Sequence, residues 1–209
     1  MIVITIPILS DNYSYLIIDK NNKTCSAVDP ASPKEIIPYL EKKKLHLKNI
    51  LNTHYHSDHT AGNLDLKKKY KCKIFGPEKE KDQIPGIDVT LKENDTVELQ
   101  LYKAKIIETP GHTDGSVCFQ IDNHLFTGDT LFVGRTGRTI STNASTKDLY
   151  FSVYDKILSL PGNTLIYPGH DYGEKPTISL KDNIKLSPLL QAKSEKDFIE
   201  RMADYEANR

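Results

Sequence analysis

Apolar residues along the first part of the chain recur in short runs that are typical of β-strands. The runs at 2–6, 13–19 and 24–29 contain many β-branched and aromatic residues, and turn residues separate them. This pattern predicts three successive strands that form a meander. Five further strands are predicted on similar grounds, at 48–53, 105–109, 116–121, 124–128 and 164–167. Asp122 and Asn123 predict a tight turn between two of them.

The segment 33–44 predicts the first helix. Ser32 resembles an N-cap, Pro33 stands at the first helical position, and Glu35 resembles the acid of a capping box. Pro38 lies inside the segment and is expected to kink or shorten the helix.

Helices are also predicted later in the chain, at 61–70 and at 145–160. The second of these has apolar residues at the helical period behind a serine or threonine cap, namely Leu149, Val153, Ile157 and Leu160. The 39 residues after His170 predict a loop and one helix, with Ser194 as its cap and Phe198 and Met202 on its inner face.

The order of these elements predicts a mixed α/β sandwich, because strands come in antiparallel runs with single helices between them. The sequence contains no repeat of fixed period, no low-complexity segment and no Gly/Ser linker. We therefore expect one domain over residues 1–209, in which residues 171–209 form a C-terminal loop and helix appendage.

Composition narrows the class of protein. The hydrophobic fraction is 38%, the mean hydropathy is −0.48, and no apolar run approaches the roughly 18 residues of a membrane span. The N-terminus lacks the basic region and cleavage site of a secretory signal. The 28 basic and 28 acidic side chains balance, so no nucleic-acid partner is indicated. Three widely spaced cysteines, Cys25, Cys72 and Cys118, suggest reduced thiols in a cytoplasm.

The segment Asn52 to Thr60 concentrates three of the seven histidines of the chain. On a helix, His54 and His56 would point about 200° apart and could not share an ion. At a strand end that turns into a helix, His54, His56, Asp58 and His59 can converge, and imidazole and carboxylate donors suit zinc or iron. The alternative is a polar loop in which histidines only cap a helix.

Three more donors follow predicted strands. They are His112 in a glycine-flanked loop, Asp129 beside Gly128, and His170 after the strand at 164–167. Each has a structural alternative, as a turn or loop residue. Together with the histidine segment, they can supply the ligands of two metal ions at one edge of a sandwich.

The motifs "THYHSDH", "PGHTDGS", "FTGDTLF" and "PGHDYG", in that order, resemble the metallo-β-lactamase superfamily over residues 1 to about 190. The resemblance implies an αββα sandwich of the metallo-β-lactamase type, here with a short C-terminal helical tail. It also implies two divalent metal ions, zinc or alternatively iron or manganese. The first ion would take His54, His56 and His112, the second would take Asp58, His59 and His170, and Asp129 would bridge them.

Within this superfamily, "PILSDNYSYLI" and "GDTLFVG" resemble glyoxalase II, which hydrolyses S-D-lactoylglutathione to D-lactate and glutathione. Two bridged dications can turn a bound water into the nucleophile, a metal-bound hydroxide, so no serine or cysteine nucleophile is required. Asp58 is placed to be both ligand and proton acceptor. Cys118 lies in "SVCFQI" and is expected to be a strand residue of the core.

A second resemblance leaves the reaction open. "GRTGRT", "LIYPGHDYG" and "SEKDFIERM" resemble the glutathione persulfide dioxygenase branch, which implies a single Fe(II) held by His54, His112 and Asp129. Ile140 stands where that branch commonly has aspartate. The same ligands in a purely structural site are a further alternative, although structural zinc is usually closed by four ligands rich in cysteine.

A glutathione conjugate, whether thioester or persulfide, is the expected small-molecule partner. Because glutathione carries two carboxylates, its site should offer fixed cations. Arg135 and Arg138 follow Asp129 in a glycine-containing loop, and Tyr172 follows His170. We therefore predict these three residues as substrate-binding residues. The alternative is two solvated arginines and a packing tyrosine.

Overall fold

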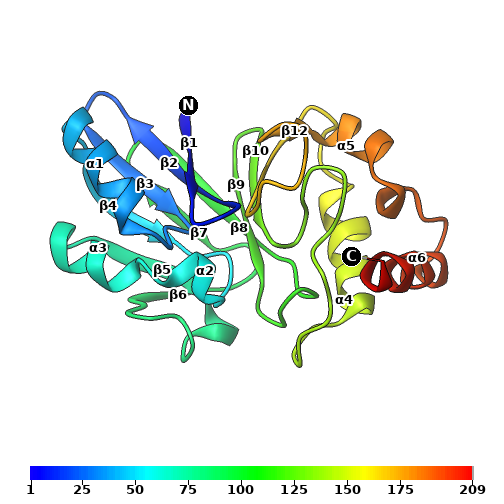
Figure 1. Cartoon of the computed structure of the whole chain (residues 1–209). Helices are drawn as coiled ribbons and strands as arrows, with labels where there is room; N and C mark the ends of the chain where they lie inside the picture. Colours follow the sequence, from blue (N-terminus) through cyan, green and yellow to red (C-terminus); the bar gives the residue numbers. More distant parts are fainter. Residues whose placement is uncertain (209) are drawn as a thin grey trace. The chain divides into compact units, whose positions relative to one another are not determined.

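The structure is a computed structural model that describes residues 1–208 (Figure 1). The chain forms two compact units, Met1–Ile106 and Ile107–Arg209, which we call unit 1 and unit 2. The expectation of a single domain over residues 1–209 stays a prediction. No helix in the described part of the chain is long and apolar enough to cross a membrane.

Unit 1 is built on a mixed sheet of six strands in the order β1-β2-β3-β4-β5-β6. The strands β1, β2 and β3 pair antiparallel, which confirms the predicted meander, and β3 to β6 pair parallel. Their bounds are Ile2–Ile8, Asn12–Asp19, Thr24–Val28, His46–Leu51, Lys73–Pro77 and Val89–Leu91.

Three α-helices and a 3₁₀ turn connect these strands, namely α1 (Pro33–Lys43), α2 (Ser57–Thr60), α3 (Asn63–Tyr70) and η1 (Glu78–Glu80). The helices α1 and α3 pack next to each other beside the sheet (Figure 1). Apolar side chains of both helices and of the strands form one buried cluster, with Ile36, Leu40, Leu66, Leu16, Ile50 and Ile74 among its members.

Two details of α1 differ from the prediction. The Ser32 side chain makes no capping hydrogen bond, so the predicted capping box is absent from this helix. Pro38 lies inside α1, and the helix continues to Lys43, so it is not shortened, while the kink expected at Pro38 stays a prediction. The burial of Ile36 and Leu40 in the core of unit 1 explains this, because packing of an apolar face stabilises a helix beyond the preferences of its single residues.

The last strands of unit 1 are β7 (Thr96–Leu99) and β8 (Tyr102–Glu108), which pair antiparallel. The strand β8 extends across the boundary between the units.

Unit 2 contains the strands β9 (Val117–Ile121), β10 (His124–Gly128), β11 (Leu165–Pro168) and β12 (Ile178–Ser179), in the order β12-β11-β10-β9. The pairing is mixed, since β10 is antiparallel to β9 and parallel to β11. Asp122 and Asn123 connect β9 to β10, and Asp122 has a positive φ of 52°, as tight hairpin turns require. The predicted turn is therefore confirmed.

Helical segments of unit 2 follow β10 and β11. The predicted helix at 145–160 is α4 (Thr146–Phe151) continued by the π-helix η2 (Ser152–Ile157), and Ser145 is its cap. The C-terminal region has more structure than predicted: β12, α5 (Leu180–Leu186) and the 3₁₀ turn η3 (Pro188–Gln191) precede α6 (Glu195–Ala207).

The helix α6 matches the prediction in detail. The Ser194 side chain accepts a hydrogen bond from the backbone of Asp197, and Phe198 and Met202 are fully buried. Figure 1 shows α6 beside α4, which it contacts.

Candidate metal centre

In unit 1, the predicted ligands lie where β4 ends and α2 begins. His54 and His59 are fully buried, whereas His56 and Asp58 are partly exposed. His54 Nε2 lies 3.0 Å from His56 Nδ1, and His59 Nε2 lies 3.6 Å from Asp58 Oδ2. The structure therefore brings these four predicted residues together within unit 1.

A buried carboxylate, Asp29, sets the proton positions of this group. Its Oδ1 accepts a hydrogen bond from the Thr53 backbone at 2.8 Å, and its Oδ2 accepts from Thr53 Oγ1 at 2.6 Å. His59 Nδ1 lies 3.0 Å from the same Oδ2. Because a carboxylate only accepts, Nδ1 of His59 carries the proton and its Nε2 carries the lone pair.

The same reasoning applies to His54. Thr53 Oγ1 gives its hydrogen to Asp29, so it accepts from His54 Nδ1 at 3.0 Å. The lone pair of His54 is then on Nε2, which faces His56 Nδ1. A cation between these nitrogens would suit them, because two imidazoles that bind one ion place their donor atoms close together. The donor chemistry of unit 1 therefore fits a metal.

Asp58 has a partner that the sequence did not reveal. The side-chain amide of Asn12, which is buried in β2, donates to Asp58 Oδ2 at 2.9 Å and to the Asp58 backbone carbonyl at 3.2 Å. This contact fixes one oxygen of the carboxylate and orients the other.

In unit 2, the predicted ligands gather around Asp129. His112 Nε2 lies 3.5 Å and His170 Nε2 lies 3.3 Å from Asp129 Oδ2. Donor atoms bound about 2.0–2.1 Å from one tetrahedral ion lie roughly 3.3–3.4 Å apart, so these three side chains also fit a metal. Asp129 and His170 are buried and follow the ends of β10 and β11, as predicted.

The loop after Asp129 holds His112 in place. His112 Nδ1 lies 2.8 Å from the backbone carbonyl of Arg138, which can only accept, so Nδ1 is the donor and the lone pair is on Nε2. Ser141 Oγ donates to the carbonyl of His112 at 3.3 Å, and the Ser145 backbone donates to that of Gly111 at 2.8 Å. The histidine is therefore oriented by a neighbouring loop, in the way metal-binding histidines usually are.

The three predicted substrate-binding residues have different surroundings. Arg135 is half-buried, donates to the Tyr172 carbonyl at 3.1 Å and lies 5.6 Å from the centroid of the Tyr172 ring. Tyr172 stacks on His170, with ring centroids 4.9 Å apart and planes at 7°. Arg138 is exposed. Arg135 thus supports the loop after His170, while Arg138 offers its charge to solvent.

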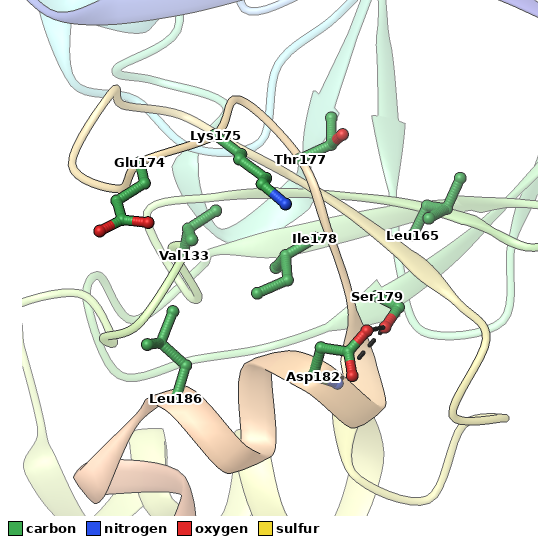
Figure 2. Close-up of a pocket in the computed structure, with 9 residues that line it drawn as sticks. All are labelled: Val133, Leu165, Glu174, Lys175, Thr177, Ile178, Ser179, Asp182 and Leu186. Atoms are coloured by element: carbon green, nitrogen blue, oxygen red, sulfur yellow. Dashed lines mark hydrogen bonds between the residues drawn. The ribbon is translucent and has the colours of Figure 1, made fainter.

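Two cavities lie in unit 2, and one of them is lined in part by Arg135. One, of about 340 Å³, is shown in Figure 2 and is lined by Val133, Leu165, Glu174, Lys175, Thr177, Ile178, Ser179, Asp182 and Leu186. Its rim carries charges of both signs and favours neither an anion nor a cation. The other, of about 530 Å³, is lined by Arg135 together with Gly134, Pro188, Leu189, Arg201, Asp204, Tyr205 and Asn208.

The cysteines are not arranged as nucleophiles. Burial raises the pKa of the Cys25 thiol to about 12 and that of Cys72 to about 11, so both are protonated at neutral pH. Cys118 is fully buried in β9, as expected for a core residue.

Comparison with known proteins identifies the family of the chain. The family model described as the metallo-beta-lactamase superfamily matches residues 10–170. A hydroxyacylglutathione hydrolase from Pelagibacter ubique is 45% identical over 166 residues, which cover 78% of this chain and 68% of that protein. One from Brucella ovis is 41% identical over 165 residues, which cover 78% of this chain and 63% of that protein. The chain thus spans about two thirds of the length of these curated relatives.

Among solved structures, ETHE1 from Myxococcus xanthus is 29% identical with a TM-score of 0.89, and the match covers 100% of this chain and 93% of that chain. The expected α/β fold of the metallo-β-lactamase type, with mixed sheets and a short C-terminal helical tail, is confirmed. The chain therefore belongs to the metallo-β-lactamase superfamily and, within it, is a relative of the hydroxyacylglutathione hydrolases.

Proposed function

We propose that the protein is a metal-dependent hydrolase of glutathione thioesters, with S-D-lactoylglutathione as its substrate and D-lactate and glutathione as its products. The observation that carries this proposal is the 45% identity to a hydroxyacylglutathione hydrolase over 78% of the chain. A cytoplasmic location remains a prediction.

We propose that the seven predicted ligands hold two divalent ions. His54, His56 and His112 would bind the first, and Asp58, His59 and His170 would bind the second, with Asp129 shared. The support is family membership and the lone-pair directions and donor spacings within each unit. When bound, such ions supply Lewis acidity and lower the pKa of a coordinated water.

The residues of the chain would then bind the substrate and move its protons. Asp58 would accept the proton of the attacking water, because its carboxylate is held by Asn12 and is partly exposed. Arg138 would pair with a carboxylate of glutathione, since its guanidinium is exposed and arginine binds carboxylates bidentately. The Tyr172 ring would form a wall beside His170.

The second candidate is a glutathione persulfide dioxygenase that uses a single Fe(II). It is favoured by the motifs that resemble the persulfide dioxygenase branch and by the likeness to ETHE1 from Myxococcus xanthus, which extends over 100% of this chain. In this case His54, His112 and Asp129 would hold the iron. Persulfide, dioxygen and water would give glutathione and sulfite.

Metal content and two assays separate the candidates. The purified protein would be analysed by plasma mass spectrometry and then tested for thiol release from S-D-lactoylglutathione and for dioxygen consumption with glutathione persulfide. We expect two ions per chain and thiol release without dioxygen consumption. One iron per chain with dioxygen consumption would replace the hydrolase proposal by the dioxygenase.

The variant His59→Ala gives an independent check. His59 belongs only to the proposed second ion, so its loss should abolish a two-metal hydrolase but leave a one-iron dioxygenase with much of its activity. Full thioester hydrolysis by this variant would contradict the two-ion proposal.

A further inference from the structure

We propose that Glu206, at the end of α6, is a positioning residue for His112 and acts through the peptide bond between Arg138 and Thr139. This inference rests on the proposed metal-binding role of His112. It assigns to the C-terminal helix a part in the metal centre.

One peptide group connects the two residues. The carbonyl of Arg138 accepts the hydrogen bond of His112 Nδ1 at 2.8 Å. The N–H of the same peptide group, which belongs to Thr139, donates to Glu206 Oε1 at 2.6 Å. The two ends of a single peptide group are therefore held by a carboxylate on one side and by an imidazole on the other.

The location of Glu206 in its helix is unfavourable without this contact. It lies in the last turn of α6, where the helix dipole disfavours a negative charge, and that turn contains no basic residue. A carboxylate at this end of a helix gains from a donor outside the helix. The backbone N–H of Thr139 is such a donor, and the Thr139 hydroxyl adds a second hydrogen bond at 3.1 Å.

The helix itself is firmly anchored in unit 2. Phe198 and Met202 are fully buried, and the Ser194 side chain caps its first turn. Thr136 Oγ1, in the same loop as Arg138, donates to the sulfur of Met202 at 3.6 Å. The half-buried carboxylate of Glu206 is thus presented to Thr139 by a rigid element.

The chemical consequence is a relay of hydrogen bonds. A charged acceptor on the N–H polarises the peptide group and makes its carbonyl a stronger acceptor. A stronger acceptor at Nδ1 fixes the ring and increases the basicity of Nε2, as a carboxylate does when it contacts a metal-binding histidine directly. Asp29 makes that direct contact to His59 in unit 1, and Glu206 would do the same for His112 through a peptide bond.

The alternative is that Glu206 only holds the loop that contains Thr139 against α6 and has no effect on His112. Two variants distinguish the roles. Glu206→Ala removes both hydrogen bonds to Thr139, whereas Thr139→Ala removes the hydroxyl contacts to Glu206 and Thr146 but keeps the backbone N–H. A loop-fastening role predicts that Glu206→Gln, which keeps the hydrogen bond from the Thr139 backbone but loses the charge, binds metal as the wild type does.

The experiment measures zinc affinity of the full chain by competition with a chelating dye, which requires no turnover. We expect Glu206→Ala to weaken zinc binding about tenfold, the lower end of the range for residues behind a metal-binding histidine. Glu206→Gln, whose neutral amide oxygen still accepts from Thr139, should recover only part of the loss, because the charge that polarises the peptide group is gone. Thr139→Ala should remain close to the wild type. Glu200→Ala is the matched control, because Glu200 is an exposed acid of the same helix that pairs with Lys196 at 3.8 Å.

Equal zinc affinity of the wild type and Glu206→Ala would overturn the inference, as would equal losses in Glu206→Ala and Thr139→Ala. If the zinc affinities of the wild type and the variants follow the expected order but the wild type does not hydrolyse glutathione thioesters, the proposed function is refuted. The role of Glu206 is then still supported.

Discussion

At the scale of single residues, Asp29 determines which nitrogen of His59 can bind a metal. Its Oδ2 accepts from both Thr53 Oγ1 and His59 Nδ1. The sequence did not indicate this role, because Asp29 precedes His59 by 30 positions and belongs to no donor motif. The predicted ligands themselves were recognisable since four of them lie within six positions. Motifs reveal local donor clusters, but a long-range hydrogen bond is visible only in the folded chain.

The first prediction concerns Asp29→Asn. If the side-chain oxygen of the new amide still accepts from the Thr53 backbone, the NH₂ group of that amide faces His59 Nδ1. Because an NH₂ group donates, Nδ1 must accept, and the proton of the imidazole moves to Nε2. Nε2 then has no lone pair to bind a metal. We expect metal affinity to fall about 10–100-fold, measured by competition with a chelator. Asp19→Asn is the control, because Asp19 is an equally buried acid of unit 1 that accepts hydrogen bonds from the turn residues Asn21 and Asn22. Similar metal affinities in the two variants would contradict this role of Asp29.

At the scale of elements, the segments in which apolar runs and turn residues coincide were predictable, and several others were not. The meander β1 to β3 and the hairpin of β9 and β10 matched because apolar runs and turn residues coincide there. The strands β5, β6, β7 and β12 were not predicted. They have five, three, four and two residues. Their sequences carry too little periodicity, and pairing with neighbouring strands decides their conformation.

The loop after Asp129 supports a second prediction, for Gly137→Ala. A Cβ atom on Gly137 would lie 1.8 Å from the backbone oxygen of Asp129, so the backbone at this proposed ligand would have to move. We expect a loss of about 1–3 kcal/mol in the free energy of unfolding, together with reduced metal content. The measurements are chemical denaturation and plasma mass spectrometry.

Gly162→Ala is the matched control for that variant. Its Cβ would approach only Lys181 Cβ, at 3.2 Å, and Gly162 is distant in sequence from every predicted ligand of unit 2 except His170. It should keep its metal. Normal metal content in Gly137→Ala would show that the close packing of this loop does not support Asp129.

At the scale of the whole molecule, the order of the motifs was sufficient to identify the superfamily, and the family match over residues 10–170 confirms it. The sequence could not specify the reaction with the same certainty. The histidines and carboxylates suit several metals, and both the hydroxyacylglutathione hydrolases and ETHE1 are similar to this chain.

The C-terminal region was predicted as a loop and one helix. It contains two further helical elements, α5 and η3, and both contribute buried leucines to the core of unit 2.

The last prediction tests whether ligands from the two units serve the same ion. His59 belongs to unit 1 and His170 to unit 2, and both are proposed ligands of the second ion. If they share it, His59→Ala already removes most of the binding energy, so adding His170→Ala should cost little more. Residues that act as one unit behave in this non-additive way in double-mutant cycles.

The double-mutant cycle would be measured as the zinc affinity of the wild type, both single variants and the double variant. As the control cycle, His59→Ala would be combined with Glu200→Ala, where we expect simple additivity. Additive losses for His59 and His170 would mean that the two histidines bind separate ions, and the proposed ligand assignment would have to be abandoned.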